Sequence, residues 1–323
     1  MERILRLVIG ACRAVLRTLA THRQRVPWPE KLVRGALLVP VFGTVFVLLR
    51  VWSWLRGPLS VRTTTRDGAR FQCRLPDMIQ TYLYLFGVWE PDLTAFIASR
   101  LRPGDTFVDV GANIGYHTLL AARKLAGEGR VVAIESSPKI FRLLGESLAE
   151  NGSPSDVRTV NRAASDAIGE LSLYEGPEKN IGLSTTVSSR GLPSEGTISA
   201  APLADLLQPE EIETARLVKI DVEGAEVAVL RGMKSFLERC PPSVELVVEL
   251  SPSWWTDRSR SPQEVLNPFV EAGFHVYEID NNLWPWRYLW PEAVCRPRHV
   301  RRPLTEFVGR LDLVLSRVDA NQL

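Results

Sequence analysis

The fold is decided by the stretch Asp105-Thr-Phe-Val-Asp-Val-Gly-Ala-Asn-Ile-Gly-Tyr116. Residues 106–110 form a short apolar run rich in β-branched residues, which predicts a buried parallel strand. Gly111 and Gly115 follow, and leucines then recur at helical spacing over residues 117–126. A strand, a glycine turn and a helix form the first half of a doubly wound nucleotide site. An ordinary tight turn between a strand and a helix is the alternative.

The spacing of the two glycines bears on the ligand. A dinucleotide fold carries Gly-x-Gly-x-x-Gly, whose central glycine lets bare backbone approach a pyrophosphate. Asn113 occupies that central position here, and its side chain would crowd a diphosphate. The glycines still permit close approach to an uncharged group, or to a ligand that carries an amino-acid moiety.

Two further apolar runs also end on an acid, at Glu135 and at Asp221. Because the carboxyl ends of parallel strands meet at the ligand-binding edge of an open α/β sheet, these acids and Asp109 should face one crevice. A carboxylate at Glu135 can accept hydrogen bonds from both hydroxyls of a ribose, or be a solvated strand-end acid. Asp109 can fix the loop or hold an ammonium group. Together with the glycine spacing, this pattern favours S-adenosylmethionine over NAD.

Composition narrows the class of protein. A chain of 323 residues with 45% hydrophobic and 24% charged residues is typical of a globular protein, here one large α/β unit with additions. A net charge of +2 indicates no general affinity for nucleic acid. The four cysteines and four histidines are scattered without Cys-x-x-Cys, so we expect no metal site and a reducing compartment, although folding could gather some histidines.

The first 56 residues differ from the rest of the chain. They hold ten Lys and Arg against Glu2 and Glu30, a charge of +8, which leaves −6 for the remainder. Residues 1–21 have the pattern of a basic amphipathic helix. The apolar run 35–49 is shorter than the roughly 20 residues that a spanning helix needs. Three interpretations stay open: a surface-lying membrane anchor, one tilted span, or helices packed on the globular domain.

The sequence suggests three regions. Residues 1–56 are followed by a hairpin and helical cap over 57–104 and by a core over 105–317. A segment rich in Gly, Ser and Thr, 176–202, predicts a long surface loop. The runs 274–279 and 311–315 predict an antiparallel pair that closes the sheet.

Three blocks carry a family resemblance: Phe107-Val-Asp-Val-Gly-Ala-Asn-Ile-Gly-Tyr-His-Thr118, Ile181-Gly-Leu-Ser-Thr185 and Val218-Lys-Ile-Asp-Val-Glu-Gly-Ala-Glu226. In order and spacing they resemble the FkbM-type class I methyltransferases, over roughly residues 85–316. The resemblance implies a Rossmann-like α/β fold, with a seven-stranded, mostly parallel sheet and an antiparallel last strand. It also implies S-adenosylmethionine as the methyl donor, and an oxygen of a small molecule or glycan as the acceptor.

The resemblance assigns roles to single residues. Asp109, Gly111, Asn113 and Gly115 would form the loop at the methionine side of the cofactor, Glu135 would bind the ribose, and Ala164 would border the adenine. Asp221 would lie where such enzymes meet their substrate. One departure is Glu135-Ser-Ser-Pro138, where many relatives have Glu-Pro-x-Pro. Residues 1–56 have no counterpart in the family core.

An alcohol acceptor must lose a proton, so a nearby base is useful. Asp221 and Glu223 are the candidates, with His117 third. The alternatives are a cofactor-binding or capping role for Asp221, a solvated first-turn acid at Glu223 and a packed side chain at His117. For the whole protein, the rivals are a nucleotide-binding oxidoreductase and an inactive membrane-tethered protein of the same fold. We expect a cytoplasmic enzyme held at a membrane surface by residues 1–56, acting on a lipid-linked or amphiphilic acceptor.

Overall fold

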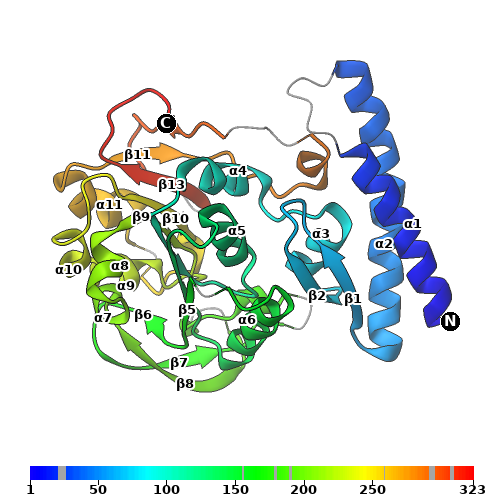
Figure 1. The fold of residues 1–323 in the computed structure, drawn as a ribbon, viewed down its shortest axis with the longest axis horizontal. Helices are drawn as coiled ribbons and strands as arrows, with labels where there is room; N and C mark the ends of the chain where they lie inside the picture. Colours follow the sequence, from blue (N-terminus) through cyan, green and yellow to red (C-terminus); the bar gives the residue numbers. More distant parts are fainter. Residues whose placement is uncertain are drawn as a thin grey trace. The chain divides into compact units, whose positions relative to one another are not determined.

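The protein is described by a computed structural model over residues 1–20, 27–154, 156–177, 180–188, 191–257, 259–290, 295–305 and 309–323 (Figure 1). The chain divides into two compact units. Unit 1 comprises residues 1–96, 178–180 and 281–295, and unit 2 comprises residues 97–177, 181–280 and 296–323. The boundaries expected after residues 56 and 104 stay predictions.

Unit 2 is built on an eight-stranded sheet with the order β12-β11-β13-β10-β9-β3-β4-β5 within the described residues. Strands β10, β9, β3, β4 and β5 are parallel neighbours, whereas β13 runs antiparallel to both β10 and β11. This confirms the mostly parallel sheet with a reversed last strand, and β12 adds a two-residue edge. The bounds are β3 (Thr106–Val110), β4 (Arg130–Ile134), β5 (Val157–Val160), β9 (Ala215–Ile220), β10 (Glu245–Leu250), β11 (His275–Glu278), β12 (Arg298–His299) and β13 (Leu311–Ser316).

Every residue of β3 and of β10 is buried. Such continuous burial requires helices on both faces of the sheet, which explains why these strands have apolar runs instead of alternation. The hydroxyl of Ser137 caps the helix after β4 by accepting from the N–H of Ile140 at 3.3 Å. The helices are α5 (Tyr116–Leu125), α6 (Pro138–Glu150), α7 (Leu203–Leu206), α8 (Pro209–Glu213), α9 (Glu226–Arg231), α10 (Lys234–Leu237), α11 (Pro262–Glu271) and the 3₁₀ turn η3 (Pro252–Trp254).

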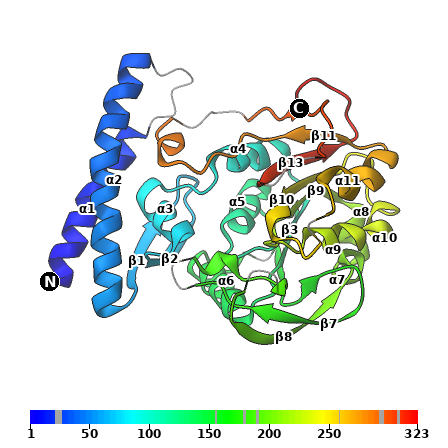
Figure 2. The ribbon, with the colours of Figure 1, turned by 180° about the vertical axis from the view of Figure 1, so that it is seen from behind.

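A second, three-stranded sheet corrects one prediction. It has the order β6-β8-β7, with β6 (Ala163–Ala164), β7 (Gly169–Tyr174) and β8 (Ser194–Ala201), and Figure 2 shows β7 and β8 side by side. The prediction of a loop throughout 176–202 was therefore wrong for its last third. Ile198 and Ala200 of β8 are buried together with Leu173 of β7. This burial depends on the pairing of the two strands, so the Ser- and Thr-rich composition of the segment did not indicate it. The short turn η1 (Ile181–Leu183) precedes this strand.

Unit 1 contains two long helices that lie side by side in both views (Figures 1 and 2). Arg17 of the first helix donates hydrogen bonds to the carbonyl oxygens of Thr64, Leu83 and Tyr84 at 3.0–3.2 Å. Burial is the main cause that lowers the pKa of Arg17 to about 10. This half-buried arginine fastens the first helix to the rest of the unit. The elements are α1 (Glu2–Leu19), α2 (Trp28–Arg56), β1 (Leu59–Thr64), β2 (Arg70–Leu75), α3 (Met78–Phe86) and η4 (Pro285–Tyr288), while α4 (Pro91–Arg100) contains the point of division.

The apolar run 35–49 lies inside α2, a helix of 29 residues that continues through Pro40. By length and composition alone, α2 is long and apolar enough to cross a membrane. One stripe of α2 packs within unit 1: Phe42 lies 5.7 Å from the ring of Tyr82 and 6.2 Å from that of Phe86. The remaining surface of α2 exposes the large apolar residues Trp28, Leu32, Val33, Leu37, Val39, Phe46, Val47, Val51, Trp54 and Leu55.

Candidate active site

The glycine turn after β3 is pressed against the chain that follows β9. Gly111 has φ +80°, and a Cβ built on it would lie 1.8 Å from the carbonyl oxygen of Asp221. Gly115 has φ +87°, and its Cβ would lie 2.6 Å from Leu144 Cδ1. Only glycine satisfies both the positive φ and the close approach. Asn113 also has a positive φ of 52°, and its Oδ1 accepts a hydrogen bond from the N–H of Ile114 at 2.8 Å.

Glu135, directly after β4, has both carboxylate oxygens on backbone groups. Its Oε2 accepts from the N–H of Asn113 and its Oε1 from the N–H of Ser137, each at 2.9 Å. Burial raises the pKa of Glu135 to about 7, even though these two hydrogen bonds act to lower it. Each oxygen can accept a second hydrogen bond, so the carboxylate holds the turn and still has acceptor capacity for a ligand hydroxyl.

A buried lysine connects two of the predicted acids. Lys219 Nζ donates to Asp221 Oδ2 at 3.1 Å and lies 3.6 Å from Asp109 Oδ1. The other oxygen of Asp109 accepts from the hydroxyl of Thr118 at 2.7 Å. Burial raises the pKa of Asp109, and the positive charge of Lys219 opposes that rise. These contacts favour the loop-fixing role of Asp109. The sequence analysis missed Lys219, although a lone lysine inside an apolar strand was the available signal.

Acids lie at the carboxyl ends of β9 and β10, with Asp221 and Glu223 after β9 and Glu249 near the end of β10. Glu223 has φ +55°, and its carbonyl oxygen accepts from the hydroxyl of Thr185 at 2.8 Å, which joins the second and third sequence blocks. Glu249 is buried in β10, and burial raises its pKa well above the usual range. The negative charges of Asp221 and Glu223 raise it further, whereas Arg310, 3.3 Å away, lowers it. Glu249 was not among the expected site residues, and an acid near the end of an apolar strand was its signal.

The remaining predicted residues are His117 and Ala164. His117 is buried on α5, where burial lowers its pKa well below 6.5 and the charge of Lys219 lowers it further, so its imidazole is neutral at physiological pH. Ala164 is buried in β6 of the smaller sheet. Glu226 accepts from Gly224 N–H and from Trp255 Nε1 at 2.6 and 2.9 Å, which indicates a structural role. The roles of His117 and Ala164 stay predictions.

Folding gathers two of the four dispersed histidines. His275 Nδ1 and His299 Nδ1 lie 3.9 and 3.8 Å from one carboxylate oxygen of Asp319. These three residues could hold a metal ion. Strands β13, β10 and β9 separate β11 from β3, so this group is not part of the glycine-turn site.

The fold and the site together define a class of enzyme. A glycine turn after the first strand of a mostly parallel sheet, an acid after the second strand and a reversed strand at the far side fit a class I S-adenosylmethionine-dependent methyltransferase. The close backbone approach at Gly111 and the open acceptor positions of Glu135 suit the methionine and ribose parts of that cofactor.

Comparison with known proteins agrees with this assignment. The Methyltransferase FkbM domain matches residues 109–276, and the chain belongs to the FkbM methyltransferase family. The Hexuronic acid methyltransferase AglP of Haloferax volcanii is 30% identical over 184 residues, which cover 57% of this chain and 72% of the relative. Methyltransferase sdnD of Sordaria araneosa is 30% identical over 160 residues, 41% of this chain and 61% of the relative.

Among solved structures, a SAM-dependent O-methyltransferase from Thermotoga maritima has a TM-score of 0.38 at 16% identity, covering 84% of this chain and 82% of that one. This likeness is too distant to carry an argument. The family membership shows that the protein is a methyltransferase that uses S-adenosylmethionine, as expected from the three sequence blocks. Membership of this family rules against the rival interpretation of the sequence, a nucleotide-binding oxidoreductase.

Proposed function

We propose that the enzyme transfers a methyl group from S-adenosylmethionine to a hydroxyl oxygen of a sugar-containing or small-molecule acceptor. The observation that carries the proposal is the contact between the glycine turn and the segment after β9. The Cα of Gly111 lies so close to the carbonyl oxygen of Asp221 that a Cβ would come within 1.8 Å of it. The proposed cofactor loop and the proposed acceptor-side acids therefore adjoin.

For the cofactor we propose the residues that the sequence indicated. The loop from Asp109 to Gly115, including Gly111 and Asn113, would hold the methionine part, Glu135 the ribose hydroxyls, and Ala164 would border the adenine. When bound, the cofactor supplies an electrophilic methyl group on a sulfonium. The protein must align the acceptor oxygen with that group, and such orientation contributes on the order of 7–11 kcal/mol to lowering a barrier.

We propose that the base that takes the acceptor proton is one of the acids at the carboxyl ends of β9 and β10. Asp221 is paired with Lys219 at 3.1 Å, so one oxygen of its carboxylate already accepts from an ammonium group. Glu223 lies two residues further on. Glu249, whose pKa is raised by burial, has more affinity for a proton near neutral pH, so we add it to Asp221 and Glu223 as a candidate. His117 stays the weakest candidate because burial lowers its pKa well below 6.5, so its imidazole has little affinity for a proton.

A sugar acceptor is supported by the relative named a hexuronic acid methyltransferase. The test is transfer of a labelled methyl group to glycan, lipid and small-molecule extracts, followed by mild base. A label that survives base is an ether on a hydroxyl oxygen, which is the expected product. A label released as methanol is an ester on a carboxylate and would contradict the hydroxyl assignment. Absence of transfer to all three extracts would contradict the acceptor classes proposed.

We further propose that unit 1 attaches the enzyme to the cytoplasmic surface of a membrane, with α2 in the plane of the surface. Trp28 and Trp54 at its ends are 70% and 85% exposed, and aromatic residues of this kind favour the interface. Each basic residue near an anionic leaflet contributes about 1 kcal/mol. Because the opposite stripe packs through Phe42 on Tyr82 and Phe86, a spanning α2 would have to carry α3 into the bilayer or lose this packing.

A further inference from the structure

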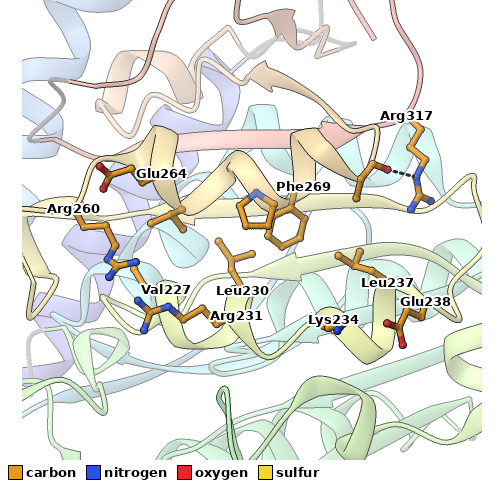
Figure 3. Close-up of a pocket in the computed structure, with 13 residues that line it drawn as sticks. Val227, Leu230, Arg231, Lys234, Leu237, Glu238, Arg260, Glu264, Phe269 and Arg317 are labelled. Carbon is orange, nitrogen blue, oxygen red and sulfur yellow. Dashed lines mark hydrogen bonds between the residues drawn. The ribbon is translucent and has the colours of Figure 1, made fainter.

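Two neighbouring pockets of unit 2 share one boundary. The first, here called the head pocket, has a volume of about 420 Å³, and Gly224 is one of its lining residues. The second, here called the tail groove, has a volume of about 510 Å³ and lies between α9 and α10 on one side and α11 on the other (Figure 3). Val227, Arg231 and Arg260 line both pockets, so the pockets meet at two arginines.

The head pocket is suited to a hydroxylated group. Thr186, Ser188 and Thr256 bring hydroxyl groups to its lining, which also includes Gly224, the residue that follows Glu223 in sequence. Asp166 and Asp257 add carboxylates, which accept hydrogen bonds from hydroxyls. Thr185, whose hydroxyl donates to the carbonyl oxygen of Glu223, directly precedes Thr186 of this lining, which connects the head pocket to the segment after β9.

The tail groove is suited to a hydrocarbon chain. Its buried floor contains Leu230, Val265 and Phe269, and Leu237 extends it along α10. The charged residues at its rim are Lys234, Glu238, Glu264 and Arg317. Two of these have partners of their own: Glu264 caps α11 at Ser261, and Arg317 donates to the carbonyl oxygen of Ala272 at 3.4 Å. The charged side chains therefore lie at the rim, and the floor of the tail groove is apolar.

The two arginines at the junction extend toward one another from opposite walls, as Figure 3 shows. Arg260 Nε lies 3.6 Å from Asp257, a side chain that is 56% exposed, and an exposed pair of this kind is weak. Arg231 has no ion pair or hydrogen bond among the residues that the structure describes. Two facing guanidinium groups repel one another until an anion lies between them, and the planar guanidinium fork matches phosphate and carboxylate oxygens.

We propose that the acceptor is an anionic amphiphile, a sugar joined through a phosphate to a hydrocarbon chain. This inference rests on the proposed function and adds the acceptor class. The sugar occupies the head pocket, the phosphate lies between Arg231 and Arg260, and the chain follows the tail groove. A phosphodiester suits the junction because it carries a substituent on each side, whereas a carboxylate carries only one.

The test measures binding of three probes to the full-length protein below their micelle concentrations: n-octyl phosphate, n-octyl glucoside and inorganic phosphate. We expect n-octyl phosphate to bind at least tenfold more tightly than either of the others. Arg231→Gln with Arg260→Gln should reduce this preference to about twofold or less. The matched control, Arg142→Gln with Arg239→Gln, removes the same charge from exposed positions outside both pockets and should keep the preference. Leu237→Gln should weaken both octyl probes equally.

S-adenosylmethionine binding is measured on the same samples and reports on folding and on the proposed function separately. Equal affinity for the two octyl probes in the unaltered protein would overturn the inference, and so would a preference that survives loss of both arginines. If n-octyl phosphate is preferred through the arginines but S-adenosylmethionine does not bind, the proposed function fails while the anion site stands. If S-adenosylmethionine binds and n-octyl phosphate is not preferred, only the acceptor class fails.

Discussion

The carboxylate of Glu135 accepts a hydrogen bond from the backbone N–H of Asn113 at 2.9 Å. The acid proposed to bind ribose therefore also holds the turn proposed to bind the methionine part of the cofactor. Because burial raises the pKa of Glu135 to about 7, its charge changes within the physiological range. If Glu135 binds the ribose as proposed, cofactor binding, loop order and pH are coupled through this one carboxylate.

The first prediction concerns that coupling. Ribose hydroxyls donate to the ionised carboxylate, so affinity for S-adenosylmethionine should rise as pH increases from 6 to 8, with the change centred near the pKa of about 7. Glu135→Gln should weaken binding by roughly 1.5–3 kcal/mol at pH 8, the range for hydrogen bonds to charged groups, and should flatten the pH dependence. Calorimetric titration at pH 6, 7 and 8 measures both effects.

Glu226 provides the matched control, because its pKa is also raised to about 7 by burial but its partners are Gly224 and Trp255. Glu226→Gln should keep the pH dependence of binding.

Stability gives an independent check. Because its folded-state pKa lies above the unfolded-state value of about 4.5, Glu135 binds its proton more tightly in the folded state, so its contribution to stability falls as pH rises from about 4.5 to about 7. Glu135→Gln should reduce that fall, and an unchanged slope would contradict the assignment.

The second prediction tests the close approach at Gly111. Gly111→Ala places a Cβ 1.8 Å from a backbone oxygen and also strains φ at +80°. Gly127→Ala has the same strain at φ +82° with nothing within 4 Å of its Cβ. The control should lose roughly 1–3 kcal/mol of unfolding free energy, the usual cost of such backbone strain. Gly111→Ala should lose clearly more, and S-adenosylmethionine binding should be lost as well. Unfolding in denaturant measures both losses. If the two variants lose equal unfolding free energy, the contact with the Asp221 carbonyl oxygen costs little to relieve.

The third prediction concerns Lys219, whose ammonium group lies between Asp109 and Asp221. Lys219→Met leaves uncompensated carboxylates and should destabilise the protein by about 3–5 kcal/mol, the usual cost of breaking a buried pair. Without the lysine, the folded-state pKa of Asp109 rises further. The deficit should therefore grow as pH rises from the folded-state pKa of Asp109 in the unaltered protein to its higher folded-state pKa in the variant. Unfolding in denaturant at pH 5 and pH 8 measures it.

Two variants frame this result. Adding Asp109→Asn to Lys219→Met removes the buried charge and should recover part of the lost stability at pH 8. Lys124→Met removes an exposed lysine of α5 and should change stability by no more than about 0.5 kcal/mol. A pH-independent deficit in Lys219→Met would show that lost packing, and not charge, is responsible.

The fourth prediction distinguishes the candidate bases. Asp221→Asn, Glu223→Gln and Glu249→Gln are compared in single-turnover methyl transfer with saturating cofactor. Loss of the base should slow the reaction by roughly 10²–10⁴-fold, while the dissociation constant of S-adenosylmethionine stays within a few-fold. Raising the pH should not restore the base variant. If all three variants react at the normal rate, none of these acids is the base and alignment alone accounts for catalysis.

The fifth prediction concerns the exposed face of α2. Val39→Asp with Val47→Asp changes residues that are 72% and 59% exposed, so the fold should survive. Co-sedimentation of the full-length protein with anionic vesicles should fall strongly in this variant. Ile168→Asp with Val318→Asp, at 75% and 56% exposure in unit 2, adds the same charge and should leave sedimentation unchanged. Equal sedimentation of both variants would contradict attachment through α2.

Truncation before residue 57 would be a poorer test. Arg17 of α1 donates to backbone carbonyls of β1 and α3, and Phe42 of α2 packs on α3. Removing both helices would uncover this part of unit 1 and confuse unfolding with loss of membrane contact.

The sequence by itself determined the parallel sheet, the glycine turn and the family. Each of these depends on short-range patterns: apolar runs that end on Asp109, Glu135 and Asp221, and glycines at positions where a Cβ cannot fit. Patterns of this kind are local, because strand burial and positive φ act on neighbouring residues. The preference for S-adenosylmethionine over NAD came from the same spacing.

Only the tertiary structure decided which groups meet. Lys219 and Glu249 gain their roles because β9 lies beside both β3 and β10, and strand order is not written in any single segment. The same holds for β8, whose burial depends on pairing with β7, and for Arg231 at the end of α9 and Arg260 in the segment before α11, which line the same two pockets. Sequence analysis expected amphipathicity at the N-terminus, but the apolar face of α2 that stays exposed depends on what packs against the other stripe. Non-local contacts set the burial and the charge environment, and these decide the chemistry of the site.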